Sequence, residues 1–366
     1  MGMLIKWELR KILHDRLVFW GSVLLLIFNI ANFCAASVPA MAARTTDHED
    51  YVSGLAAVQL EQELAKRYGD ILTDEAVAQM LADLAFSEEF LARTGGVNVK
   101  YIYNNFLQQA VQTHFAEPDG HFNGLTVAEV FGSETIKVGY TAGWLATAEY
   151  MLRVMLLLSV LVVLALAPVF AGEYEGMDAL LLTARYGRTR LVWAKCIAGL
   201  GFAAGLALLV LGLNYGVAWL CFGSEGLEAS ILFAADNPYS FIEQNLSCGQ
   251  LILWQSRLAI TAVLTTAALT LALSAALPNR YMALAASAGL LFLPLLVSPS
   301  PERPLYTLWM LAPAYQLLSN HLLALGTFSL GGRSLLWAWW ALPASLLAVG
   351  AGLCGAKRAF GGREVR

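Results

Sequence analysis

The stretch VMLLLSVLVVLALAPVFAGEYEGMDALLLTARYGRTRLVWAK, residues 154–195, decides the fold class of this chain. Its first part, 154–171, carries no charged side chain. An apolar helix needs about 20 residues to cross the hydrocarbon core of a membrane, because it rises about 1.5 Å per residue and must satisfy its own backbone hydrogen bonds. Acidic and basic residues then gather in 172–195. The stretch therefore predicts a membrane-spanning helix followed by a charged connection.

The composition extends this prediction to the whole chain. The 366 residues are 58% hydrophobic and 14% charged, and the mean hydropathy is +0.60, which places the chain outside the soluble globular class. We expect an all-α, polytopic membrane protein with six transmembrane helices. The expected spans are Leu17–Ala36, Val154–Ala171, Cys196–Phe222, Leu258–Leu277, Tyr281–Val297 and Ser334–Ala356.

The first apolar run could also be a cleaved signal peptide, because basic residues precede it and a small-residue site, Ala40–Ala42, follows it. Its apolar segment is about 20 residues long, against about 7–15 in such peptides. We therefore expect this run to be retained as the first span.

The distribution of lysine and arginine predicts the orientation. Basic residues cluster in 1–16, in 172–195 and in 357–366, and such clusters favour the cytoplasmic side. Six spans put all three segments on one side, so we expect a plasma-membrane protein with both termini in the cytoplasm. Residues 39–149 contain 16 Asp and Glu against 6 Lys and Arg, a balance of −10, and are expected outside. No basic surface suggests a nucleic-acid partner.

The sequence predicts three regions. Residues 1–38 hold an N-terminal interfacial helix and the first transmembrane helix, because Ile5, Leu9 and Ile12 repeat at helical spacing beside basic residues. Residues 39–148 form a helical extracytoplasmic insert between the first two spans. Residues 149–366 hold the remaining five spans, a cytoplasmic coupling loop (172–195) and an outer re-entrant segment (300–333).

Capping signals support helices in the second region, and the basic C-terminal tail argues against a seventh span in the third. In the insert, Thr73 and Ser87 are expected N-caps, and Thr126 with Glu129 fits a capping box. The re-entrant segment is apolar enough for a seventh span, but a seventh crossing would place the basic C-terminal tail outside. We expect a pair of re-entrant or interfacial helices there instead.

Motifs of catalysis are weak in this chain. The match of 350–355 to GxGxxG lies inside an expected span and is better explained by helix packing. His114, Glu117, Asp119 and His121 are residue types that bind metals, but the Pro118-Asp119-Gly120 sequence favours a solvated turn. Cys221 and Cys248 could form a disulfide or stay free. We expect no catalytic residue, no metal site and no cofactor, and hence no enzyme.

The charged connection resembles a known family. Phe170–Arg188, with glutamates, a glycine and a run of leucines, followed by Lys195, is similar to the loop after the second span of ABC-2 type permeases, the membrane subunits of type-2 ABC exporters. The segment WELRKILHDR, residues 7–16, and the six spans resemble the same family. The resemblance implies that separate ATPase subunits dock on the inner face and that a second permease copy or paralogue completes the pathway.

The resemblance also implies roles for individual residues. The ATPase-coupling residues would be Glu173, Glu175, Gly176, Leu182, Arg185, Arg188, Arg190 and Lys195, and the interfacial helix would contribute Trp7, Arg10 and Lys11. The resemblance also implies that ATP hydrolysis occurs on another chain, in agreement with the lack here of the GxxxxGK[ST] loop that holds phosphates. The expected function is therefore the permease subunit of an ATP-driven exporter. The alternative is a non-transporting multi-pass membrane protein whose outer helical domain binds a ligand or partner.

Overall fold

The structure is a computed structural model, and it describes residues 1–45, 51–94, 103–173, 187–234, 244–296, 309, 311–318, 327–330, 333–336 and 338–362. The helices are α1 (Gly2–His14), α2 (Arg16–Asn32), η1 (Phe33–Ser37), α3 (Leu55–Arg67), α4 (Asp74–Asp83), α5 (Glu88–Thr94), α6 (Phe106–Phe115), α7 (Val127–Phe131), α8 (Ala142–Leu166), α9 (Pro168–Ala171), η3 (Gly187–Leu191), α11 (Val192–Phe222), η4 (Ile231–Phe233), α12 (Cys248–Ala276), α13 (Arg280–Leu296), α15 (Pro313–Gln316) and α17 (Ala338–Gly361). Two antiparallel hairpins join β1 (Ala42–Ala43) to β2 (Val52–Ser53) and β3 (Thr327–Leu330) to β4 (Arg333–Leu336).

Five helical segments in the described part of the chain are long and apolar enough to cross a membrane. They are Arg16–Ser37, Ala142–Ala171, Thr189–Phe222, Cys248–Ala276 and Ala338–Gly361. The fifth expected span, 281–297, corresponds to α13, an apolar helix of 17 residues with Pro294 inside it. The chain thus fits a multi-pass, all-α membrane protein, and the sixth crossing stays a prediction.

The C-terminal region differs from the sequence expectation. The last long helix begins at Ala338 and not at Ser334, because Arg333–Leu336 pairs with Thr327–Leu330 as a β-hairpin. Within 300–333, the described residues also do not form the expected pair of helices. They form the four-residue helix α15 and the strands of that hairpin, whereas the other residues of this segment lie outside the described ones.

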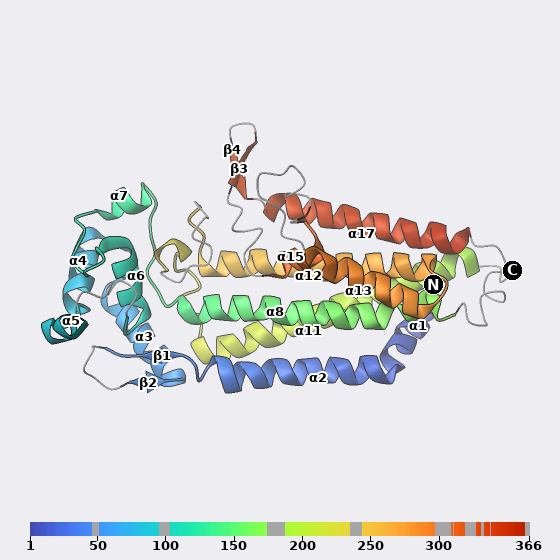
Figure 1. Cartoon of the computed structure of the whole chain (residues 1–366), viewed down its shortest axis with the longest axis horizontal. Coiled ribbons are helices and arrows are strands. Elements are labelled where there is room, and N and C mark those ends of the chain that lie inside the picture. Colours follow the sequence, from blue (N-terminus) through green and yellow to red (C-terminus); the bar gives the residue numbers. More distant parts are fainter. Residues whose placement is uncertain are drawn as a thin grey trace. The chain divides into compact units, whose positions relative to one another are not determined.

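The chain divides into two compact units, and the first comprises Met1–Asn29, Tyr150–Leu213 and Trp254–Arg366. Its long helices run along a common direction (Figure 1). Glycine allows two of them to approach closely, since a Cβ on Gly352 of α17 would lie 2.8 Å from the backbone of Ala268 in α12. This contact confirms that 350–355 belongs to a packed helix and not to a nucleotide-binding loop.

The second unit comprises Ile30–Glu149 and Asn214–Leu253, so the insert predicted at 39–148 does not form a compact unit alone. Helix α6 lies at its core, with Leu107, Val111 and Phe115 fully buried. The expected helix signals are confirmed, because Thr73 and Ser87 accept hydrogen bonds from backbone N–H groups three residues later, and the capping box of α7 is present. All five cysteines, including Cys221 and Cys248, are free.

Buried polar side chains connect α6 to neighbouring segments of this unit. The Glu61 carboxylate of α3 accepts a hydrogen bond from the Phe106 N–H at 3.2 Å. The side chain of Gln108 donates to the Leu84 carbonyl at 2.6 Å and accepts from the Asn104 N–H at 2.6 Å. Burial raises the pKa of Glu61 to about 7, although the hydrogen bond from Phe106 opposes this rise.

The loop after α11 packs tightly against the segment that leads into α8. The Trp144 indole N–H donates to the Glu225 carbonyl at 2.9 Å, and Gly226 adopts φ +83°. A Cβ on Gly226 would lie 1.8 Å from the Tyr140 carbonyl oxygen, whereas one on Gly223, at φ +70°, would meet nothing within 4 Å. Glycine is therefore required at position 226 both by its conformation and by the space available.

These two glycines provide a matched test of the loop. We predict that Gly223→Ala lowers the free energy of unfolding by about 1–2 kcal/mol, the usual cost of a left-handed L-residue. Gly226→Ala should cost more than about 4 kcal/mol, because the methyl group adds an overlap with a buried carbonyl. Thermal denaturation of the detergent-solubilised chain measures both effects, and similar losses for the two variants would contradict the packing described here.

The raised pKa of Glu61 predicts a pH-dependent stability. Between pH 4.5, the ordinary value, and pH about 7, the folded chain holds a proton that the unfolded chain has released. The stabilisation is therefore complete below this window and is lost as the pH rises through it. The midpoint of thermal denaturation should fall from pH 5 to pH 8 in the unchanged chain and fall less in Glu61→Gln. An identical pH profile for the two proteins would show that Glu61 is not responsible.

Candidate functional site

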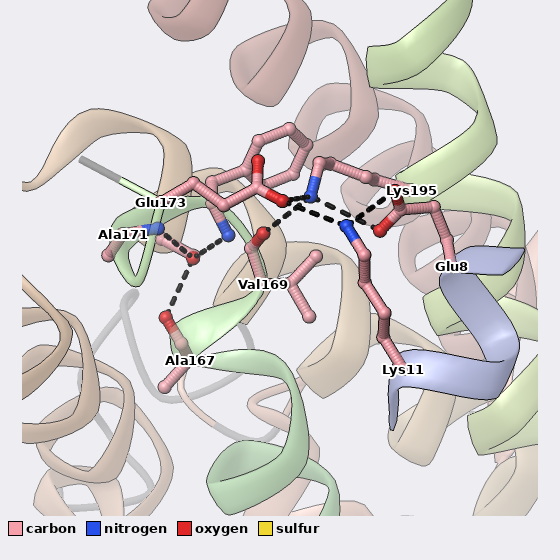
Figure 2. A network of polar contacts seen from close by, with 9 residues as sticks. Glu8, Lys11, Ala167, Val169, Ala171, Glu173 and Lys195 are labelled. Carbon is pink, nitrogen blue, oxygen red and sulfur yellow. Dashed lines mark hydrogen bonds and ion pairs between the residues drawn. The ribbon is translucent and has the colours of Figure 1, made fainter. Parts of the chain in front are cut away.

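Four charged side chains of the first unit form a network, here called the charge network: Glu8 and Lys11 of α1, Glu173 after α9, and Lys195 of α11 (Figure 2). The Lys195 Nζ lies 2.8 Å from Glu173 Oε1 and 3.2 Å from Glu8 Oε2. The Lys11 Nζ lies 3.2 Å from both Glu8 Oε1 and Glu173 Oε1. Two carboxylates thus face two ammonium groups, and the formal charge of the network is zero.

Lys195 is the buried centre of this network. Its side chain is 1% exposed, and that of its partner Glu8 is 8% exposed. An ammonium group has three N–H donors, and a third acceptor, the Val169 carbonyl, lies 2.8 Å from Nζ. The charge is therefore paired and every donor is used, which is the condition under which a lysine can be buried without a large loss of stability.

The backbone next to this network is held by Ser274 of α12. Pro168 lacks an N–H and interrupts the hydrogen-bond ladder between α8 and α9. The Ser274 hydroxyl donates to the Ala167 carbonyl at 2.7 Å and accepts from the N–H groups of Phe170 and Ala171 at 3.0 and 3.2 Å. One side chain thereby satisfies three backbone groups and fixes the direction in which the chain leaves α9.

An aromatic contact extends the same site to the last long helix. The Lys195 Nζ lies 5.5 Å from the ring centroid of Phe170, within the range of a cation–π interaction. The ring of Phe170 lies 5.3 Å from that of Phe360 in α17. Side chains around Lys195 therefore connect α1, α9, α11, α12 and α17.

The Lys11 end of the charge network is exposed to solvent. The Lys11 side chain is 61% exposed. Burial lowers the pKa of Lys11, but the charges and hydrogen bonds of Glu8 and Glu173 raise it, and the net shift is upward. Glu173 Oε2 is buried and has no hydrogen-bond partner within the described part of the chain. Lys11 therefore carries the solvent-exposed charge of the network, and Glu173 Oε2 is an acceptor left over among the described residues.

The structure brings together three of the residues that the sequence singled out: Glu173, Lys195 and Lys11. Trp7 is 56% exposed on α1, and the Arg10 guanidinium lies 5.8 Å from its ring centroid. Neither contacts the charge network through any interaction that the structure gives. Arg190 is exposed in η3, and Arg188 lies in the same turn with its side chain not described. Glu175, Gly176, Leu182 and Arg185 lie outside the described residues.

Sequence reasoning missed Glu8 and Ser274. Glu8 had a recognisable signal, because it lies three residues after Ile5 and four before Ile12, on the apolar stripe of a basic helix. An acid at such a position predicts a buried cationic partner. Ser274 had no such signal, because serine is common in membrane helices and its role depends on the neighbouring Pro168.

No family model, curated protein or solved structure matches this chain. The ion pairs of the charge network connect α1, the end of α9 and α11, which include segments far apart in the sequence. Among the described residues, no group of three or more His, Cys, Asp or Glu side chains could hold a metal ion.

The different burial of the two lysines predicts different costs for the same substitution. Lys195→Met should destabilise the chain by about 3–5 kcal/mol, because it leaves buried carboxylates without their cation. Lys11→Met should cost less than about 1 kcal/mol, because this ammonium is largely solvated. Thermal denaturation of both variants checks the difference.

A double variant tests the electrostatic reason for this cost. Adding Glu173→Gln to Lys195→Met restores a net charge of zero and should recover part of the lost stability. If the double variant is less stable than Lys195→Met alone, charge balance is not what holds these segments together.

Proposed function

We propose that this chain is the permease subunit of an ATP-driven exporter of the ABC-2 type, which forms the transmembrane pathway and couples to a separate ATPase subunit. The charge network is the observation that supports this most directly. It joins α1 to both ends of the connection 172–195, and these are the segments that the sequence resemblance assigns to ATPase docking. A force applied to the connection would therefore act on α1, α9 and α11 together.

The contacts beyond the network suggest how such a force would spread. Ser274 ties the backbone of α9 to α12, and Phe170 contacts Phe360 of α17. Helices that are packed and hydrogen-bonded in this way move as a group between discrete arrangements and do not deform continuously. Nucleotide state on the ATPase would bias two such arrangements of the permease.

The proposal includes six crossings, with α13 as the fifth. Its 17 residues span about 25 Å, a few ångströms less than the core of an average membrane, and local thinning can accommodate this difference. Both termini and the connection 172–195 would then lie in the cytoplasm of a plasma-membrane protein, with the insert outside. ATP hydrolysis would take place on the partner chain, and a second permease copy or paralogue would complete the pathway.

A second candidate is a non-transporting membrane protein whose outer domain binds a ligand or partner. A cavity of about 190 Å³ inside the second unit favours it, and its lining residues include Leu81, Phe86 and Val111. The two candidates differ in whether an ATPase is bound, so one experiment separates them.

The test is purification of the full chain from its native membranes in mild detergent. We expect a P-loop ATPase to co-purify, together with ATP hydrolysis. Arg188→Glu, in the connection, should reduce the amount of bound ATPase by about fivefold or more, the usual effect of reversing an interfacial charge. Arg93→Glu, in the insert, should leave it unchanged. A stable monomer without ATPase, or equal losses in both variants, would favour the second candidate.

A further inference from the structure

Helix α1 turns its apolar stripe toward the protein. Ile12 is 6% exposed, and Ile5 and Leu9 on the same stripe are half-buried. Glu8 lies on this side too, where it pairs with Lys195 in the charge network. The stripe that predicts an interfacial helix is therefore covered by protein, and a different face of α1 is left exposed.

The exposed face of α1 carries two kinds of side chain. Met3 is 76% exposed and Trp7 is 56% exposed, and the basic residues Lys6 and Arg10 are exposed beside them. These four positions follow the spacing i, i+3, i+4 and i+7, so they share one side of the helix. Glu8, on the buried side, is the only acid of this helix. The exposed face is therefore apolar and basic at once.

The position of α1 relates this face to the membrane. Helix α1 ends at His14, and the apolar helix α2 begins at Arg16. Asp15 fixes the turn between them, because its Oδ1 accepts hydrogen bonds from the N–H groups of Leu17 and Val18 at 2.9 and 3.2 Å. Figure 1 shows α1 turned away from the axis of α2. The exposed face therefore lies at the level where the first apolar span would leave the hydrocarbon core.

Basic groups lie over aromatic rings at this end of the first unit. The Arg10 guanidinium carbon lies 5.8 Å from the ring centroid of Trp7. The Lys357 Nζ of α17 lies 5.9 Å from the ring centroid of Trp193, which is two residues from Lys195. Aromatic rings favour the headgroup layer of a membrane, and basic side chains beside them meet the phosphates of lipids.

The composition of the exposed face favours one environment over the others. Water would leave Met3 and Trp7 without apolar contacts, whereas hydrocarbon would bury the charges of Lys6 and Arg10 at a high cost. The headgroup layer accepts both kinds of side chain. Near an anionic membrane surface each basic residue adds about a fivefold preference.

A protein partner is less suited to this face than lipid. The connection 172–195 contacts α1 through Glu8 and Lys11, which lie on another side of the helix from Met3, Lys6 and Arg10. The exposed face is therefore directed away from the segment that the sequence resemblance assigns to ATPase docking.

We propose that the face formed by Met3, Lys6, Trp7 and Arg10 binds the headgroups of anionic phospholipids, with the basic side chains on the lipid phosphates and Met3 and Trp7 beside the acyl chains. This inference goes beyond the ATP-coupled function and does not depend on it. It gives the N-terminal helix a preference among lipids.

The test uses the full chain, purified without ATPase and reconstituted in phosphatidylcholine vesicles. The vesicles contain a minor fraction of either dibrominated phosphatidylglycerol or dibrominated phosphatidylcholine, because bromine quenches tryptophan fluorescence at short range. The Trp7 signal is the difference between the unchanged chain and Trp7→Phe. We expect the anionic lipid to quench it about twofold or more strongly than the neutral lipid at low salt, and equally at high salt.

Matched variants locate the effect. Trp219 is also 56% exposed and has no Lys or Arg within four residues, so the difference between the unchanged chain and Trp219→Phe should show equal quenching by both lipids. Replacing Lys6 and Arg10 together with Gln should abolish the preference at Trp7. The same replacement of Lys66 and Arg67, two exposed basic residues of α3, should leave it unchanged.

Two outcomes would overturn the proposal. Equal quenching of Trp7 by the two brominated lipids at low salt would leave this face to a protein partner. An unchanged preference after the replacement of Lys6 and Arg10 would show that these side chains do not select the lipid. Because the replaced side chains are exposed and no ATPase is present, neither outcome bears on the co-purification test of the proposed function.

Discussion

The buried ammonium group of Lys195 is the constraint on which the first unit depends. A charge that is 1% exposed is tolerated only if opposite charges and acceptors surround it. Glu8 of α1, the Val169 carbonyl of α9 and Glu173 directly after α9 supply them, so the acceptors come from two segments far apart in the sequence. The need to neutralise one side chain therefore fixes the N-terminal helix, the end of α9 and the start of α11 relative to one another.

Backbone satisfaction adds a second constraint of the same kind. In a membrane no water replaces a hydrogen bond lost at a proline, so another protein group must do so. Ser274 meets this requirement at the interruption near Pro168. The site therefore pairs both its buried charges and the backbone groups near Pro168. A movement that separates α1, α9 or α12 would break ion pairs or hydrogen bonds of this site.

The second unit follows the same rule around the start of α6. The Glu61 carboxylate of α3 accepts from the Phe106 N–H of α6. The side chains of Asn105 and Gln108 donate to the carbonyls of Arg44 and Leu84, so buried polar groups connect the start of α6 to three other segments. Gln112 lies on the same helix and is equally buried, yet its oxygen has no hydrogen-bond partner among the described residues.

The sequence by itself determined the membrane class, five of the six expected spans as long apolar helices, and the caps at Thr73, Ser87 and Thr126. These features depend on local composition and on spacing along one helix. The α-helical character of α13 also followed from its apolar run, but its 17 residues leave its crossing undecided.

Only the tertiary structure decided which charges meet. Glu8 and Lys195 are 187 residues apart, and no local pattern specifies their pairing. The same is true of Ser274 and the backbone near Pro168, of the joining of 214–253 to the insert, and of the β-hairpin that delays the start of the last helix to Ala338. Such contacts arise because burial forces polar groups from distant segments to satisfy one another, and a sequence read one helix at a time does not contain that information.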